Sequence, residues 1–450
     1  MAVDEEAKKA AMKSMSGKRS AFHWQPMCQV WLLVCVRMVI NMARVAMGPL
    51  IVAMTPHFNY SLEVKGQILS AFSAGYTLTQ IAGGLAAERW GGAPILTLSL
   101  LSAAMAMLLM PMVASLGVSP LWLMLFSAGF LQGPVFAGMQ VMISNWTSAS
   151  LASYASMLAG AGTTAGSVIG LGFAPFLIDT FGWQVASQVV GAMSLLFAAV
   201  FAMYAHSRPS DGDDGSSCAG KKTTSEKSNL SLTTAWSSIQ ILFKLPVLAI
   251  FSAHIGTNFV RTFYMSFMPI YFAEVLKTSI ALSGTCLVFP ELSAVFLGIL
   301  GARIARTLQD RGLVSPLGCL RLFSAISAVG VALSLVMVSS LTGLVPVTIC
   351  LCAVQVFASL NNAGYAANYP LVTKRQSGLV SGVGNMFASV GSYYAPIFAS
   401  SMLADDSLPM IDRWPRLFLA VAGYNALAVA LYIPFASAVS LDVSTDKKDS

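Results

Sequence analysis

The sequence contains few charged residues. Only 10% of its 450 residues are Asp, Glu, Lys or Arg, whereas 56% are hydrophobic and the mean hydropathy is +0.71. A soluble domain carries about 25% charged residues, so this shortage excludes a soluble globular protein and indicates repeated membrane crossings. The net charge of +7 does not indicate a nucleic-acid partner, because the basic residues lie mainly between the apolar runs.

Groups needed for catalysis or metal binding are also scarce. The seven cysteines are scattered, mostly inside apolar runs, and form neither a disulfide framework nor a metal site. The chain has no GxxxxGK[ST] phosphate loop, no pair of carboxylates within the apolar runs and no His/Cys cluster. We therefore expect neither an enzyme nor an ATP-driven pump, and no metal or cofactor.

Long apolar runs, in contrast, are numerous. A helix that crosses a membrane needs roughly 20 mostly apolar residues. The pattern predicts an all-α polytopic membrane protein with twelve transmembrane helices, six on each side of a long polar segment. The expected spans are 28–54, 66–88, 94–114, 119–144, 151–178, 184–205, 246–273, 280–302, 316–339, 342–369, 377–403 and 414–437.

The polar segments divide the chain into five expected regions. The central loop among them is rich in Ser, Asp, Lys and Gly, so we expect it to be largely disordered. Acidic residues in the N-terminal tail, and the lack of a small-residue cleavage site after the first run, argue against a transit peptide and against cleavage. We expect a monomer. The regions are an N-terminal tail (1–27), a six-helix bundle (28–205), the central loop (206–245), a second six-helix bundle (246–441) and a C-terminal tail (442–450).

The distribution of Lys and Arg predicts the orientation in the membrane. Cytoplasmic loops carry an excess of these residues. One side of the expected topology carries the basic tails and most basic loop residues, so we expect both termini and the central loop in the cytoplasm. The other side carries only Lys65, Lys277, Arg413 and Arg416.

A glycine-rich motif occurs once in each half, which indicates an internal repeat. It begins at Gly83 after the second span and again at Gly301 after the eighth. Small residues allow helices to approach closely, and the charges cap helix ends, so we expect a cytoplasmic gate here. The gate residues in the first copy are Gly84, Glu88, Arg89 and Gly91.

This motif resembles the signature of the major facilitator superfamily, although Glu88 stands where aspartate is usual. The resemblance implies two pseudo-symmetric six-helix bundles. Within the superfamily, segments 43–48, 75–84, 181–183 and 269–275 resemble the anion:cation symporter branch of phosphate, sialic acid and vesicular glutamate carriers. That branch often has a glutamate in place of Gln132 and an arginine in place of Thr257. The organophosphate:phosphate antiporters are similar at Arg44, Arg261 and Gln132-Gly133, so both branches remain open.

Three arginines and one carboxylate lie inside apolar spans, which predicts a positively charged cavity. Arg37, Asn41 and Arg44 share one helix face. Each arginine near the bilayer centre costs about 2.5–3.5 kcal/mol, so this face must turn toward protein or water. The spacing from Arg44 to Arg261 nearly equals that from Gly83 to Gly301, and the pseudo-two-fold should place the two arginines opposite each other near the mid-membrane. They could bind an anion bidentately or serve structure by bonding helix carbonyls.

Further polar residues are candidates for lining a solute path. Gln132 and Gln140 align on the fourth span, Asn258 lies one turn before Arg261, and Tyr365 lies on a polar face of the tenth span. The alternative is hydrogen bonding between helices, worth about 0.6 kcal/mol on average.

Glu291 is the single acidic residue deep in an apolar run, directly after Pro290. It could form a structural ion pair with Arg37, Arg44 or Arg261, or it could bind the proton that accompanies a transported anion. The sequence therefore predicts a secondary active transporter of a small organic or inorganic anion, coupled to a proton or another cation such as sodium. The alternatives are an organophosphate/phosphate antiporter and a facilitator of a neutral solute with structural arginines.

Overall fold

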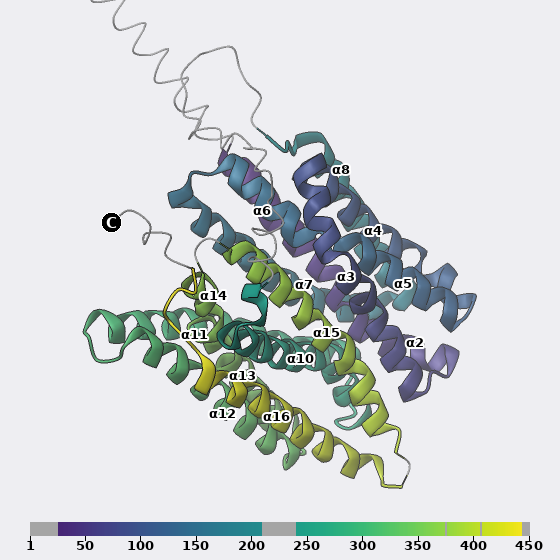
Figure 1. Cartoon of the computed structure of the whole chain (residues 1–450). Helices are drawn as coiled ribbons and strands as arrows, with labels where there is room; N and C mark the ends of the chain where they lie inside the picture. Colours follow the sequence, from purple (N-terminus) through teal and green to yellow (C-terminus); the bar gives the residue numbers. More distant parts are fainter. Residues whose placement is uncertain (1–25, 209–239, 374–375, 406, 443–450) are drawn as a thin grey trace, which may run out of the picture.

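The computed structural model describes residues 26–208, 240–373, 376–405 and 407–442, and all of its regular elements are helical. The expected tails (1–27 and 442–450) and the central loop (206–245) lie mostly outside the described residues. Figure 1 shows the helices of the first half, in purple and blue, gathered beside those of the second half, in green and yellow.

Within residues 26–208, six helical passes make up the first half. The first pass is a helix over 26–45 followed by α2, and the fourth pass consists of α5 and α6. The labelled helices are α2 (Met47–Phe58), α3 (Leu62–Trp90), α4 (Gly92–Ser115), α5 (Val118–Gln132), α6 (Val135–Trp146), α7 (Ala149–Phe181) and α8 (Trp183–Tyr204).

Six further passes make up the second half, and each of the twelve expected spans coincides with one helical pass. The tenth pass is interrupted by two short 3-10 segments. The elements are η1 (Ile241–Phe243), α10 (Leu245–Glu274), α11 (Ile280–Asp310), α12 (Pro316–Ser339), α13 (Leu344–Ser359), η2 (Leu360–Asn362), η3 (Tyr365–Asn368), α14 (Tyr369–Val372), α15 (Ser377–Leu403) and α16 (Met410–Phe435).

Nine passes within the described residues meet a criterion of length and hydropathy for crossing a membrane. Helices α3, α10 and α15 are 29, 30 and 27 residues long, but they fall outside this criterion. These helices join the two halves, because α3 packs against α15 and α10 packs against α2. Several polar residues on these helices are buried against protein, among them Ser70, Ser266 and Ser392, which helps explain why hydropathy alone understates them.

Two glycines show the pseudo-symmetry of the junction between the halves. A Cβ at Gly66 of α3 would lie 2.8 Å from the carbonyl oxygen of Pro396 on α15, and a Cβ at Gly284 of α11 would lie 2.3 Å from that of Leu171 on α7. Gly284 follows Gly66 at the same spacing that separates the two copies of the glycine-rich motif. Both positions require glycine because two helices of different halves touch there.

Three of the passes are broken near their middle. The first pass turns at Ala46, the fourth at Gly133-Pro134, and the tenth is non-α-helical over 360–368. Pro49 and Pro134 lack the N–H that would continue the helical hydrogen bonding, and the proline ring clashes with the preceding turn. Such irregular backbone occurs at membrane depth where it is enclosed by protein or lines a cavity.

The two ends of the helix bundle differ in charge. We call one the basic end, because it carries Arg89, Lys244 and Arg303–Arg311, and the other the opposite end, which carries Lys65 and Lys277. Halves meet at the opposite end: the backbone N–H of Ala281 donates to Asp179 Oδ2 over 2.9 Å, and Gly48 packs against the Met265 carbonyl. The opposite end is therefore closed in this structure.

Candidate functional site

A cavity lies between α10 and the first half. The first helix, α2, α3, α4 and α5 supply its other walls. The cavity volume is about 110 Å³, whereas one water needs roughly 10–15 Å³, so a small solute fits. Its polar lining consists of Asn41, Arg44, Ser73, Gln132, Asn258, Arg261, Thr262 and Ser266.

Arg44 lies at the end of the first helix, one turn before Pro49. Its guanidinium carbon is 4.9 Å from the centre of the Phe72 ring and 6.0 Å from that of Tyr76, both on α3. These distances are typical of cation–π contacts. The side chain is nevertheless exposed and lines the cavity, so the aromatic rings hold the guanidinium while leaving its N–H groups accessible.

Arg261 comes from the other half, near the middle of α10, and it is also exposed within the same cavity. Neither Arg44 nor Arg261 has a hydrogen bond or ion pair with another described residue. Asn41 and Asn258 both line the cavity as well, and their spacing in the sequence equals that of the two arginines. The repeat thus brings equivalent residues from both halves to one place, as the sequence predicted for the two arginines.

The side-chain amides of Asn41 and Gln132 form hydrogen bonds with neighbouring helices. Asn41 Nδ2 donates to the Thr163 carbonyl over 2.7 Å and to Ser167 Oγ over 2.8 Å, which ties the first helix to α7. Gln132 is buried at the end of α5, and its Nε2 donates to Ser102 Oγ on α4 over 3.3 Å. These bonds support the walls on either side of Arg44.

Arg37, Gln140 and Tyr365 do not line the cavity. Arg37 lies two turns before Arg44 and is half-buried, whereas Gln140 is exposed on α6. Tyr365 is buried in η3, its backbone N–H donates to Ser324 Oγ, and its ring centre is 5.5 Å from that of His254. Their part in substrate binding stays a prediction.

Sequence reasoning missed four lining residues that stand out in the structure: Phe72, Ser73, Thr262 and Ser266. Thr262 and Ser266 are one helical turn apart on α10, which is a weak signal for a shared face. Hydroxyl side chains in membrane helices commonly bond the carbonyl one turn back, so the residue type alone does not distinguish these positions from ordinary packing.

Glu291 lies on α11 and is 4% exposed. Its carboxyl oxygen Oε1 accepts a hydrogen bond from Gln355 Nε2 of α13, and Ser167 of α7 is within hydrogen-bonding reach. Because Ser167 also accepts from Asn41, a polar chain runs from the cavity to Glu291. Glu291 forms no ion pair with a described residue, so the structural ion pair considered from the sequence is absent among these residues.

The glycine-rich motif closes the turn between α3 and α4 at the basic end. Gly84 lies within α3, Glu88 and Arg89 are exposed in its last turn, and Gly91 caps the helix with φ 89°. A Cβ at Gly91 would meet Ser207 Oγ at 2.4 Å, so conformation and space both require glycine there. Gating by these residues stays a prediction.

Comparison with known proteins reveals clear relatives. Residues 33–396 match the Major Facilitator Superfamily. "Probable anion transporter 4, chloroplastic" of Oryza sativa subsp. japonica is 28% identical over 91% of this chain and 68% of its own. Sialin of Homo sapiens is 26% identical over 84% and 76%, and "Sodium-dependent phosphate transport protein 1, chloroplastic" of Arabidopsis thaliana is 28% identical over 80% and 71%.

Solved structures share the architecture. A bacterial homologue of the human lysosomal transporter Spinster, in an inward-facing and unoccupied conformation, superposes with a TM-score of 0.72 at 15% identity, covering 91% of this chain and 96% of its own. A D-xylose–proton symporter gives a TM-score of 0.70 at 11% identity, covering 91% and 97%. With twelve helical passes among the residues that the structure describes, and the match over residues 33–396, this chain is a multi-pass membrane transporter of the major facilitator superfamily.

Proposed function

We propose that this transporter carries a small anion across the membrane by alternating access, with Arg44 and Arg261 as its anion ligands. The observation that carries the proposal is that two arginines from opposite halves reach one cavity with no anionic partner among the described residues. Three relatives, named as a probable anion transporter, a sodium-dependent phosphate transport protein and sialin, support the same substrate class.

The like charges of the two arginines supply a physical basis for alternating access. Two guanidinium groups in a low-dielectric cavity repel each other, so the empty site resists closure around them. An anion that binds both groups replaces this repulsion with charge-assisted hydrogen bonds to each half. Binding would therefore draw the halves together around the solute and allow the opposite end to open.

The closed opposite end suggests the side from which this conformation loads. The halves touch there at Gly48 and Met265, and at Gly66 and Pro396. The cavity would then open toward the basic end, which the positive-inside rule assigns to the cytoplasm together with both termini. In this assignment the structure represents the state that exchanges solute with the cytoplasm.

Glu291 is our proposed coupling residue. A buried carboxyl group is costly when ionised, and the hydrogen-bond partners of Glu291, Gln355 and Ser167, are neutral. Arg261 acts on this carboxyl through its charge alone and forms no ion pair with it. The chain from Asn41 through Ser167 connects this carboxyl to the cavity. We infer that a proton bound at Glu291 travels with the anion, whereas an anion antiporter would have no need of it.

Transport by purified protein in proteoliposomes tests the proposal. Uptake of radiolabelled phosphate, sialic acid, ascorbate and small dicarboxylates should identify a substrate for the parent protein. The Arg44→Gln and Arg261→Gln variants should then lose uptake, because each removes one of the two anion ligands. Arg303→Gln is the matched control, since Arg303 is exposed on α11 outside the cavity. Near-normal uptake and affinity in both cavity variants would refute an anion site at these arginines.

A further inference from the structure

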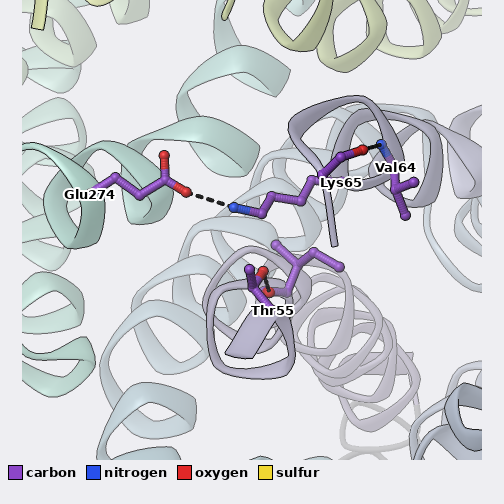
Figure 2. A network of polar contacts seen from close by, with 6 residues as sticks. Thr55, Val64, Lys65 and Glu274 are labelled. Carbon is purple, nitrogen blue, oxygen red and sulfur yellow. Dashed lines mark hydrogen bonds and ion pairs between the residues drawn. The ribbon is translucent and has the colours of Figure 1, made fainter. Parts of the chain in front are cut away.

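One ion pair joins the two halves at the opposite end. Lys65 Nζ of α3 lies 2.6 Å from Glu274 Oε1 of α10, and the two side chains are 5% and 27% exposed. Figure 2 shows Lys65 extending from its helix across the gap toward Glu274. Lysine is almost never fully buried unless it is paired, so this contact accounts for the burial of Lys65.

Neither charge suits the helix that carries it. Lys65 is the fourth residue of α3 and lies near the positive end of that helix dipole. Glu274 is the last residue of α10 and lies at the negative end. Favourable charges at these positions would have the opposite signs. Each residue therefore has an unfavourable interaction with its own helix dipole, and the two are oppositely charged. This indicates that they stabilise the contact between the halves and not their own helices.

The ion pair lies among the steric contacts that close this end. The next residue, Gly66, touches Pro396 and Ser400 of α15, and Gly48 of α2 touches the carbonyl oxygen of Met265 on α10. Gly48 and Met265 also line the cavity. Opening the cavity toward this end would move α3 away from α10, and Lys65 would have to separate from Glu274.

We propose that Lys65 and Glu274 form a charge latch that holds the opposite end closed. In the closed state each charge needs the other, because a single buried charge without a partner is strongly unfavourable. In the open state water reaches both charges, so they no longer depend on each other. Removing either charge should favour the open state, whereas removing both should leave the closed state close to its original stability.

Accessibility of a cavity cysteine measures this equilibrium without any transported solute. The reporter is Ser266→Cys, placed in the cavity lining of a variant whose other cysteines have been replaced. A membrane-impermeant thiol reagent is added to each side of sealed vesicles in turn. A separate Lys277→Cys variant, exposed at the opposite end, identifies the side on which that end lies.

The latch predicts a distinctive pattern of labelling rates when the reagent is added on the side of the opposite end. Lys65→Gln and Glu274→Gln should each accelerate labelling about tenfold or more, since tenfold corresponds to only about 1.4 kcal/mol. The double variant with both substitutions, and the exchanged pair Lys65→Glu with Glu274→Lys, should label at rates close to the parent. Asp310→Asn is the control, because it breaks the exposed Arg306–Asp310 pair within a single helix.

Three outcomes would refute the latch. Unchanged labelling in both single variants would show that the steric contacts alone close this end. If the acceleration of labelling in the double variant equals the product of the accelerations in the two single variants, the charges act independently. If one single variant fails to fold, the other single variant still tests the latch. Much faster labelling in the exchanged pair would also refute the latch, since that pair retains both charges. The labelling needs no substrate, so it does not depend on the proposed anion transport.

Discussion

The central cavity and the opposite end use charge in contrasting ways. In the cavity, two exposed arginines from different halves carry the same charge and have no partner among the described residues. At the opposite end, a lysine and a glutamate from different halves carry opposite charges and lie 2.6 Å apart, the lysine buried and the glutamate half-buried. In the proposed function the first arrangement receives its partner from outside, as the bound anion, whereas the second is complete without a ligand. A transporter that works by alternating access needs both arrangements. One contact between the halves must form when substrate binds, and another must break when the closed end opens.

Among the substitutions that test this comparison, Glu291→Gln should have the largest effect, namely the loss of proton-driven anion accumulation. Glu291 is buried near the cavity but leaves the arginines available, since Gln355 is its hydrogen-bond partner. The substitution fixes a neutral side chain at that position, so uptake against a concentration gradient driven by protons should disappear completely. Exchange of external for internal anion should survive, because the arginines are unchanged.

Proteoliposomes with an imposed proton gradient measure accumulation, and preloaded vesicles measure exchange. Glu63→Gln is the matched control, because Glu63 is exposed in the first turn of α3. Continued accumulation by Glu291→Gln would exclude Glu291 as the coupling site. Accumulation that follows a sodium gradient instead would assign the coupling to sodium at another site.

The cavity was more predictable than the opposite end. Arg44 and Arg261 could be paired from the sequence because both interrupt apolar runs and their spacing matches the internal repeat. Lys65 and Glu274 are 209 residues apart and have no such relation, since residue 283, which follows Lys65 by the repeat spacing, is a serine. Their placement at unfavourable helix ends is a signal, but it can be recognised only when the helix boundaries are known.

The fold itself followed closely from the apolar runs, and the position of Tyr365 outside the cavity lining has a physical cause. The ninth and eleventh spans match α12 and α15 at both ends. Tyr365, however, lies in η3, where the tenth pass leaves α-helical geometry. A helical projection of residues 342–369 therefore does not describe the direction of its side chain. Residues 360–368 contain no proline that would indicate this break in the sequence, whereas Pro134 indicates the break in the fourth pass.

Gly284→Ala should have the next largest effect, by weakening the closed end without changing any charge. A Cβ there would lie 2.3 Å from the Leu171 carbonyl oxygen, and such overpacking costs about 1–3 kcal/mol. The cysteine at position 266 should therefore label faster from the opposite end, as we also expect for the single variants of the latch. Gly423→Ala is the control, because a Cβ there meets nothing within 4 Å. Unchanged labelling in Gly284→Ala would show that the junction at α7 and α11 does not limit opening.

Phe72→Leu should have the smallest effect, and it tests how the cavity keeps its arginine in place. The Phe72 ring lies 4.9 Å from the Arg44 guanidinium carbon, and an exposed cation–π contact is worth about 0.5–1 kcal/mol. Leucine preserves the apolar wall but not this attraction, so Arg44 becomes more mobile and the KM for anion uptake should rise about two- to fivefold with little change in Vmax. Phe72→Tyr keeps a ring and should stay near the parent value, and Phe130→Leu, at an exposed position of α5, is the matched control. If the KM rises equally in Phe72→Leu and Phe72→Tyr, the shape of the wall matters and the cation–π contact does not.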